Sequence, residues 1–328
     1  MRALRIVPRC LAALGVVACG AVATLDQLHA QNFPTRVVRT VVPFTPGAST
    51  DLVARLFGQK LSETWGQHVV VENRGGAGGG IGAETVAKAE PDGYTQLVTN
   101  QGSILNVLLR KDVTYAIEDL APVVEFGYSP LIIVANPQFP PNDIKELIAY
   151  AKANPGKALI GSSGTNSNVH IALEVLKAAT GTDITHVPYR GTGPALNDVV
   201  AGTINGVYTT TISAEGLIKS GKVKVLGVAG PKRSDVIPEV ATYAEQGIAN
   251  ADTNVAIGLF VPARTPQPII DKVNRDVNQA LQAPDVRARF AQWGLEVAGG
   301  PPDAYAASIQ AEVRRIDALI KAKALQVQ

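Results

Sequence analysis

Sulfur, aromatic side chains and excess charge are all scarce in this sequence. Its 328 residues include two cysteines, one methionine and 5% aromatics, and 30 Lys and Arg nearly balance 28 Asp and Glu. Cys10 and Cys19 both precede residue 31, so the rest of the chain has no thiol for a disulfide, a thiolate nucleophile or a Cys-type metal site. The chain also lacks a block of Lys and Arg residues of the kind that binds nucleic acids or anionic membranes. We therefore expect neither of these partners.

Histidine is scarce too, which limits metal chemistry. After residue 30 only His68, His170 and His186 remain, and no two of them have the HExxH spacing of a zinc site. We expect no metal centre, no cofactor, and histidines that serve structure or hydrogen bonding.

Residues 1–30 predict a secretory signal peptide. Three arginines precede an apolar run of ~12 residues, and a short polar stretch ends at Ala30, the expected cleavage site. A spanning helix needs ~20 residues, so we expect no membrane insertion once the leader is removed. The alternative is a lipobox at Val16-Val17-Ala18-Cys19, in which Cys19 is lipidated.

Runs rich in Val, Ile and Leu alternate with amphipathic stretches, which is typical of an α/β protein. In almost none of these runs do apolar and polar residues alternate strictly, which favours strands buried on both faces of a parallel sheet. The expected strands are residues 37–43, 68–71, 95–99, 121–126, 131–135, 158–161, 184–188, 205–209, 224–229 and 255–261.

Apolar stripes with a period of ~3.6 residues predict helices. Two stripes, residues 52–61 and 169–176, each follow a turn of small and hydroxyl residues. A third stripe, residues 144–151, is closed by the stop signal Asn154-Pro155-Gly156. A long helix is expected over residues 303–324, with Tyr305, Ile309, Val313, Ile316 and Ile320 inward.

The length suits two domains, yet no linker separates them. Residues 128–134 and 255–262 are apolar segments that we expect to cross between two lobes and to act as hinges. The expected division is residues 31–127 plus 254–328 in lobe 1 and residues 128–253 in lobe 2.

Three segments share one arrangement: a buried strand, a turn of small and hydroxyl residues, and a helix start. They are residues 41–51, 160–170 and 187–195, and Pro194 suits the first helical position of the third. A helix start exposes unpaired N–H groups and attracts anions. Each turn alone predicts only capping. Together, at the carboxyl ends of buried strands, they predict a binding site for a carboxylate or phosphate.

Other functional patterns are weaker. Residues 78–83 fit GxGxxA, but residues 73–77 intervene after the preceding strand and no acidic residue closes a second strand ~20 residues on, so nucleotide binding is not expected. No GxSxG elbow is present. A secreted serine hydrolase built from Ser163, His170 and an Asp remains an alternative.

Several motifs resemble those of the Bug solute-binding proteins, the extracytoplasmic receptors of tripartite tricarboxylate transporters. The likeness runs in order through the chain after residue 30. It is carried by Phe33-Pro34-Thr35-Arg36, Thr40-Val41-Val42-Pro43-Phe44-Thr45-Pro46-Gly47-Ala48-Ser49-Thr50-Asp51, Trp65-Gly66-Gln67, Val69-Val70-Val71-Glu72-Asn73-Arg74-Gly75-Gly76-Ala77-Gly78-Gly79, Pro91-Asp92-Gly93-Tyr94-Thr95, Gly161-Ser162-Ser163-Gly164, Pro188-Tyr189-Arg190-Gly191-Thr192-Gly193-Pro194-Ala195 and Phe260-Val261-Pro262-Ala263-Arg264-Thr265-Pro266.

The resemblance implies a periplasmic, two-lobe binding protein of the venus-flytrap type, resembling type II, with no enzymatic activity. It implies a small carboxylated ligand in the cleft and delivery to the permease subunits of a membrane transporter. A signalling co-receptor, whose closed form docks on a sensor, is a further alternative.

The turns and the resemblance together give the candidate ligand-binding residues. The resemblance implies that residues 44–51 hold a carboxylate through amides, hydroxyls and water, and that residues 162–170 face them from the other lobe. The candidates are Phe44, Gly47, Ala48, Ser49, Thr50, Asn100, Ser103, Ser162, Ser163, Thr165, Asn168, His170, Tyr189, Gly191 and Thr209.

One position departs from the family pattern. Relatives often carry an acidic residue after the strand, in a Phe-Asp-like pair, where this chain has Tyr208-Thr209-Thr210-Thr211. A threonine can donate hydrogen bonds to an anion, so we expect a dicarboxylate without an amino group. Arg190 is expected at a solvated lobe edge, and Asp51 is expected to interact with the dipole of its helix rather than with ligand.

Overall fold

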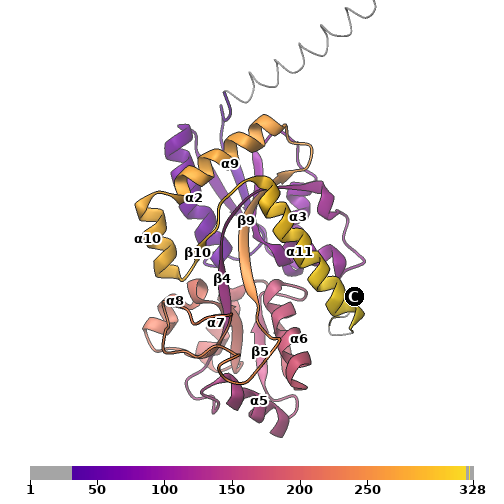
Figure 1. Cartoon of the computed structure of the whole chain (residues 1–328), viewed down its shortest axis with the longest axis vertical. Helices are drawn as coiled ribbons and strands as arrows, with labels where there is room; N and C mark the ends of the chain where they lie inside the picture. Colours follow the sequence, from indigo (N-terminus) through magenta and orange to yellow (C-terminus); the bar gives the residue numbers. More distant parts are fainter. Residues whose placement is uncertain (1–31, 323–324, 326–328) are drawn as a thin grey trace, which may run out of the picture.

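The structure is a computed structural model that describes residues 32–322 and residue 325. Two lobes are stacked along the long axis of the molecule (Figure 1). We call the lobe that holds both ends of the described chain the upper lobe, and the lobe formed by its middle part the lower lobe. The predicted signal peptide and Cys19 lie outside the described residues. Within residues 32–322, no helix combines the length and apolarity that crossing a membrane requires.

The upper lobe is built on a mixed sheet in the order β2-β1-β3-β9-β4. Strand β1 pairs in parallel with β2 and β3, whereas β9 pairs antiparallel with β3 and β4, and a short β10 pairs antiparallel with β4. These strands are β1 (Val38–Val42), β2 (Val69–Asn73), β3 (Thr95–Asn100), β4 (Leu120–Ala135), β9 (Asn254–Pro262) and β10 (Glu296–Val297).

The lower lobe contains a second mixed sheet that shares β4. The end of β4 pairs antiparallel with both β7 and β8, and β5 pairs in parallel with β6 and β7. Its other strands are β5 (Leu159–Ser162), β6 (Thr185–Pro188), β7 (Gly206–Thr210) and β8 (Lys224–Ala229).

Helices cover both faces of both sheets. In the upper lobe, residues of α2, α9 and α10 pack on one face and residues of α3, α4 and α11 on the other. In the lower lobe, α5 and α6 cover one face and α7 and α8 the other. The helices are α2 (Ser49–Trp65), α3 (Gly80–Ala87), α4 (Gln101–Ile104), α5 (Ile144–Ala153), α6 (Asn168–Thr180), α7 (Thr192–Ala201), α8 (Thr211–Lys219), α9 (Gln267–Leu281), α10 (Pro284–Trp293) and α11 (Pro302–Lys321), with 3₁₀ turns at η1 (Ala77–Gly79), η2 (Leu105–Leu108) and η3 (Ile117–Asp119).

The apolar run at the end of β4 explains this layering. Successive strand side chains point to opposite faces of a sheet. Leu131 and Ile133 accordingly pack under α5 and α6, whereas Ile132 and Val134 pack under α7 and α8. Because both faces are covered, every position of the run must be apolar.

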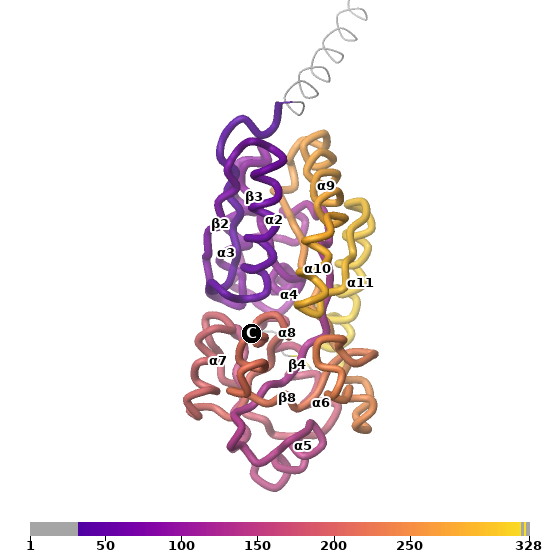
Figure 2. Tube along the Cα trace, turned by 90° about the vertical axis from the view of Figure 1, so that its left-hand side faces the viewer, coloured from indigo at the N-terminus to yellow at the C-terminus, as the bar shows by residue number. Residues whose placement is uncertain are grey.

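Strands β4 and β9 connect the lobes. Strand β4 pairs with β9 as far as Pro130 and with β7 and β8 from Leu131 onward, so it passes from one sheet to the other at that point. The chain returns to the upper lobe at Asn254, the cross-strand partner of Pro130. Figures 1 and 2 show β4 running from one lobe into the other. We call residues 128–131 and 253–255 the hinge.

The α/β class and the two-lobe arrangement with two connecting strands are confirmed, with three corrections. The expected parallel sheet is wrong: β3, β4, β7, β8 and β9 take part in antiparallel pairs, because an unbroken apolar run reports burial on two faces and not strand direction. Residues 121–126 and 131–135 belong to one strand, not two. The short strand β10 was not expected, because its two residues are too few to show a hydrophobic pattern in the sequence.

One helix start also differs. Helix α7 begins at Thr192 with Gly191 as its N-cap, so Pro194 is the third helical residue and not the first. A proline still fits there, because the first-turn N–H groups of a helix have no intrahelical partner. The other predicted helices, including residues 303–324 as far as they are described, appear as α2, α5, α6 and α11.

Candidate functional site

A small cavity of about 20 Å³ lies between the lobes, against the hinge. Both lobes contribute to its wall, and the three predicted turns all reach it. Its lining residues are Phe44, Ala48, Ser49, Thr50, Asn100, Leu131, Ser163, Asn168, Val169, Thr192, Thr209, Thr210, Ser213 and Val255.

Helix N-termini converge on this cavity. Ala48 is the N-cap of α2 and Asn100 is the N-cap of α4, both in the upper lobe. Asn168 and Thr192 are the first residues of α6 and α7, and Thr210 is the N-cap of α8, all in the lower lobe. Each helix start presents N–H groups and the positive end of its dipole, so the cavity is a place where negative charge is stabilised.

The turn before α2 is held by Asp51. Its carboxylate accepts hydrogen bonds from the Gly47 backbone nitrogen at 2.9 Å, Arg55 Nε at 3.0 Å and Asn73 Nδ2 at 2.9 Å. Burial raises the Asp51 pKa, but the hydrogen bonds from Arg55, Gly47 and Asn73 outweigh it, so the pKa lies below its usual value. Asp51 does not line the cavity, as expected; it shapes the turn from behind.

Two asparagines on opposite walls each use part of their side-chain amide in a hydrogen bond within the protein. Asn100 Oδ1 accepts from the Ser103 nitrogen at 3.2 Å, and Asn100 Nδ2 donates no hydrogen bond among the described contacts. Asn168 Nδ2 donates to the carbonyl oxygen of Asn254 at 3.2 Å.

One hydrogen bond closes the cavity between the lobes. The Ser49 backbone nitrogen, in the first turn of α2, donates to Ser213 Oγ of the lower lobe at 3.1 Å. The Ser213 hydroxyl thus accepts a hydrogen bond from an N–H group in the first turn of α2, the kind of donor that binds anions at helix starts.

Two hydroxyl groups of the cavity wall are unpaired. Thr50 and Thr209 are each 1% exposed, and their Oγ1 atoms have no hydrogen-bond partner among the described residues. A buried hydroxyl without a partner costs free energy, so each is a group that a bound acceptor would satisfy. Within the described part of the chain, no charged side chain lines the cavity.

The structure brings about half of the candidate residues together. The candidates that line the cavity are Phe44, Ala48, Ser49, Thr50, Asn100, Ser163, Asn168 and Thr209. The candidates that do not line it are Gly47, Ser103, Ser162, Thr165, His170, Tyr189 and Gly191. Ligand contact by any of them remains a prediction.

The residues outside the wall support it instead. Tyr189 turns its hydroxyl to Asp198 Oδ2 at 2.6 Å, and the buried Ser103 packs against Gly79. Gly191 lies so close to Thr45 of the upper lobe that a Cβ atom there would overlap its side chain. Arg190 is exposed, as expected for a lobe edge.

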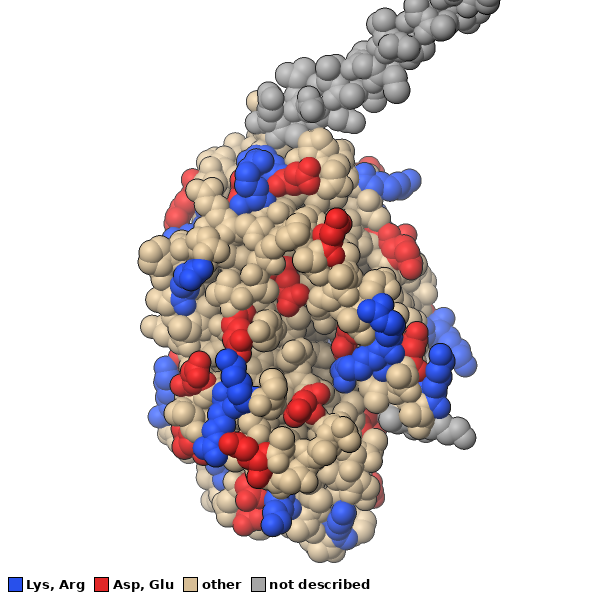
Figure 3. Space-filling model, viewed as in Figure 1, with Lys and Arg blue, Asp and Glu red and all other residues tan. Residues whose placement is uncertain are grey.

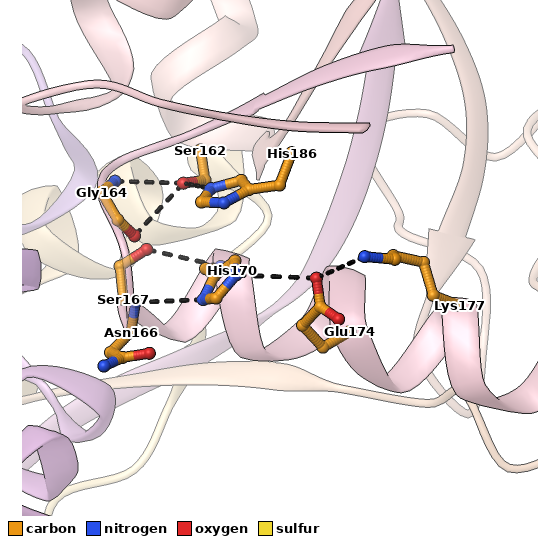
Figure 4. A network of polar contacts seen from close by, with 8 residues as sticks. All are labelled: Ser162, Gly164, Asn166, Ser167, His170, Glu174, Lys177 and His186. Carbon is orange, nitrogen blue, oxygen red and sulfur yellow. Dashed lines mark hydrogen bonds and ion pairs between the residues drawn. The ribbon is translucent and has the colours of Figure 1, made fainter. Parts of the chain in front are cut away.

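Ser162, His170 and His186 form a polar network behind the turn at residues 162–168 (Figure 4). Ser162 Oγ lies 2.6 Å from His186 Nε2, and the imidazoles of His186 and His170 stack with their centroids 4.0 Å apart. His170 Nδ1 accepts from the Asn166 nitrogen at 3.0 Å, and His170 Nε2 lies 3.6 Å from Glu174. The network fixes the backbone that carries Ser163 to the cavity.

This network does not have the geometry of the hydrolase alternative. Among the described contacts His170 bonds Asn166 and faces Glu174, and no hydrogen bond joins it to Ser163. The serine whose hydroxyl contacts an imidazole, Ser162, is fully buried and does not line the cavity. A nucleophile must reach its substrate, so this pair is structural.

The wall contains residues that sequence reasoning missed. Val169 and Thr192 lie within the predicted turns, and Leu131 and Val255 lie within the predicted crossovers. The sequence thus predicted the segments that contain these residues, but not that their side chains line the cavity. Thr210 and Ser213 begin α8, a helix start that follows a strand as the three recognised turns do. Extending the same pattern to residues 206–213 would have found them.

Glycines allow the lobes to meet. A Cβ at Gly102 of α4 would lie 2.8 Å from the backbone nitrogen of Asn168 in α6, and one at Gly78 would overlap the carbonyl oxygen of Thr165. Gly75 approaches the carbonyl oxygen of Arg190 in the same way. The lobes are therefore closed on each other through backbone contacts.

Known proteins are similar to this chain over most of its length. The family model described as the tripartite tricarboxylate transporter family receptor matches residues 53–325. The UPF0065 protein in the tcbD-tcbE intergenic region of Pseudomonas sp. is 37% identical over 290 residues, which covers 88% of this chain and 86% of that protein. Protein BugT of Bordetella pertussis is 34% identical over 311 residues, covering 94% of this chain and 95% of BugT.

Solved structures are similar over nearly their whole length. Rpa4515 of R. palustris with adipate is 32% identical with a TM-score of 0.86, covering 90% of this chain and 99% of that chain. MatC of Rhodopseudomonas palustris with bound malate is 35% identical with a TM-score of 0.83, covering 86% of this chain and 98% of that chain.

Proposed function

The chain belongs to the family of tripartite tricarboxylate transporter receptors, and on that premise we propose that it binds a small dicarboxylate in the cleft between its lobes. The supporting observation is the cavity itself: helix N-termini from both lobes, two unpaired threonine hydroxyls, and a wall without charged side chains among the residues described. Two structural relatives carry adipate and malate, both dicarboxylates.

Binding and lobe closure are coupled in this proposal. Three or four charge-assisted hydrogen bonds, at about 1.5–3 kcal/mol each, give roughly 5–12 kcal/mol. Association costs on the order of 4–15 kcal/mol, so an open surface would hold an acid weakly. A micromolar affinity, about −8 kcal/mol, therefore needs water to be excluded, which closure achieves.

The lobes must also open to admit a ligand. A cavity of about 20 Å³ has room for roughly one water molecule. We propose that residues 31–127 with 254–328 and residues 128–253 rotate about the hinge, and that the Ser49–Ser213 hydrogen bond is replaced by one to the ligand. Ligand then shifts the equilibrium toward a closed form whose cleft is wider than the 20 Å³ cavity, because that cavity has no room for a dicarboxylate.

The cellular role follows from the family. We propose that residues 1–30 direct export to the periplasm and are removed after Ala30. The closed, liganded form then delivers its acid to the permease subunits of the transporter in the membrane. We propose that the protein turns over no substrate.

A thermal-shift screen of mono-, di- and tricarboxylates tests the ligand class. At 100 times its dissociation constant a ligand adds about 2.7 kcal/mol of stability, so a dicarboxylate such as adipate or malate should raise the melting temperature by several degrees. An unmoved melting point with every acid contradicts the proposal. Calorimetry that finds tight binding of aspartate or glutamate and none of simple dicarboxylates contradicts the role of Thr209. Release of product from ester substrates contradicts a pure receptor.

Paired threonine variants locate the site. Thr209→Val removes an unpaired hydroxyl, so the unliganded protein should keep or gain stability while the affinity for the dicarboxylate falls about tenfold. Thr99→Val is the matched control, because Thr99 is also buried with an unpaired hydroxyl but does not line the cavity. Equal affinities of the two variants would place the ligand elsewhere.

A further inference from the structure

We propose that the hinge carries a second binding site on the face opposite the cleft, for a small uncharged ring compound with a hydroxyl group, and that its occupation favours the closed lobes. The site is a cavity of about 210 Å³, far larger than the cavity in the cleft. Its walls come from the hinge, from residues 231–235 of the lower lobe, and from the end of α10 with residues 294–296 of the upper lobe.

The two cavities lie on opposite faces of the same two strands. Leu131 and Val255 line the cleft, whereas their neighbours Pro130 and Asn254 line the second cavity. Pro130 and Asn254 are cross-strand partners, and successive strand side chains alternate between faces. The hinge is therefore the partition between the cavities.

Because of this placement, the size of the second cavity depends on whether the lobes are closed. When the cleft opens by rotation about the hinge, residues 231–235 move toward α10 and β10 on the opposite face, and the second cavity narrows. The 210 Å³ cavity belongs to lobes that are in contact across the cleft. A molecule that fills it binds the closed arrangement better, and differential affinity of this kind shifts the equilibrium toward closure.

Charges around the cavity are already paired or balanced. Lys232 Nζ lies 3.0 Å from Glu296 Oε1, and the Tyr128 hydroxyl donates to Glu296 Oε2 at 2.9 Å. Arg233 Nε lies 2.9 Å from Glu245 Oε2. The wall itself holds two cations, Lys232 and Arg233, and two carboxylates, Asp235 and Glu296, so its formal charge is zero.

Shape and polarity indicate the occupant. Pro130, Pro231 and Leu295 provide apolar walls. A dry cavity of about 150 Å³ holds benzene, so 210 Å³ holds a six-membered ring with a substituent. Ser234, which is 5% exposed, lies in the wall, and its hydroxyl has no hydrogen-bond partner within the described residues. A hydroxyl on the ring would satisfy it.

Cyclohexanol is a suitable probe because it neither absorbs nor carries charge. Trp293, next to the wall residue Gly294, reports binding by its fluorescence, and Trp65→Phe removes the other tryptophan. We expect a saturable change of Trp293 fluorescence with cyclohexanol and a smaller one, at higher concentration, with cyclohexane-sized ligands that lack the hydroxyl. No saturable change overturns the site, and stronger binding of benzylamine overturns the uncharged class.

Two variants on α10 form a matched pair. Ala291 lines the cavity and is exposed, so Ala291→Phe should fill the cavity and abolish the cyclohexanol signal without disturbing the core. Gln292→Phe places the same side chain one residue along, outside the wall, and should leave the signal intact. Equal loss in both variants, or loss in neither, overturns the assignment.

Coupling to the cleft is tested separately. Saturating cyclohexanol should lower the dissociation constant of a bound dicarboxylate at least threefold, and the dicarboxylate should tighten cyclohexanol by the same factor. An unchanged or raised dissociation constant overturns the preference for closed lobes. Failure of every dicarboxylate to bind contradicts the proposed function, whereas the Trp293 titration alone still decides whether the hinge site exists.

Discussion

His170 and His186 are neutral in the folded protein because of where they lie. Burial, and to a smaller extent the nearby charge of Lys177, together lower the His170 pKa to about 4. Burial, His170 and Lys177 likewise lower the His186 pKa to about 4, while Glu174 opposes them. His170 accepts a hydrogen bond at Nδ1, which only the neutral ring can do.

We therefore predict that acid destabilises the fold through these rings. Their folded pKa of about 4 lies below the usual 6.5, so the unfolded chain binds more protons between those values and stability falls as pH drops from 6.5 to 4. For His170 the loss is about 3 kcal/mol at pH 4, at about 1.4 kcal/mol per pKa unit.

Urea unfolding at several pH values measures this effect. His170→Asn keeps a hydrogen-bond acceptor near the Nδ1 position and removes the titratable ring. The stability of this variant should therefore depend less on pH between 6.5 and 4. His68→Asn, at an exposed histidine, should keep the dependence of the parent protein. A His170→Asn profile identical to that of the parent would show that another group titrates.

Helix α4 meets α6 at Gly102, and this is one of the contacts that limit how far the lobes close. Gly102 lies within a helix and does not have a positive φ, so alanine suits its backbone. Its Cβ would nevertheless lie 2.8 Å from the Asn168 nitrogen of the other lobe. Alanine thus obstructs the closed arrangement and leaves each lobe intact.

We predict that Gly102→Ala weakens ligand binding without unfolding the protein. Overpacking costs about 1–3 kcal/mol and here acts only on the closed form, so the dissociation constant should rise about 5- to 150-fold. Calorimetry gives the affinity, and small-angle scattering should show less compaction with ligand. The control is Gly216→Ala in α8, where a Cβ meets open space. If Gly102→Ala binds the dicarboxylate as tightly as the parent protein, the lobes can close on the ligand with a wider separation between α4 and α6.

The elements show how much the sequence can predict. Periodicity located α2, α5, α6 and α11, and apolar runs located β1 to β9, because burial on one stripe or on two faces leaves a direct trace in residue type. Strand direction left no such trace: Leu131 to Ala135 is equally apolar whether its neighbours run parallel or antiparallel. The two residues of β10 are too few to form any pattern.

The cavity wall was predictable where a local turn carries it and not where packing alone decides. Ser49 and Thr50 follow from the start of α2, and Ser163 and Asn168 from the start of α6. His170 and Ser162 belong to the same turn, but their side chains point to His186 and not to the cavity. Which side of a turn a side chain takes depends on tertiary contacts.

At the scale of the whole molecule the charge is balanced. The formal net charge is +2, and residues 1–30 contribute three arginines and one aspartate, so residues 31–328 are neutral. On the face seen in Figure 3 basic and acidic side chains are interspersed and form no region of one sign. Long-range steering of an anion by the protein field is therefore weak.

This balance predicts a binding constant that responds little to salt. The groups around the cavity are amides, hydroxyls and helix termini, and closed lobes keep ions away from them, whereas exposed charges beyond a Debye length of ~10 Å are screened. Between about 0.05 M and about 0.5 M sodium chloride, calorimetry should find that the dissociation constant of the dicarboxylate changes less than about threefold. A tenfold weakening would mean that an exposed cation, such as Arg190 at the lobe edge, contributes, and Arg190→Gln would then remove the salt dependence.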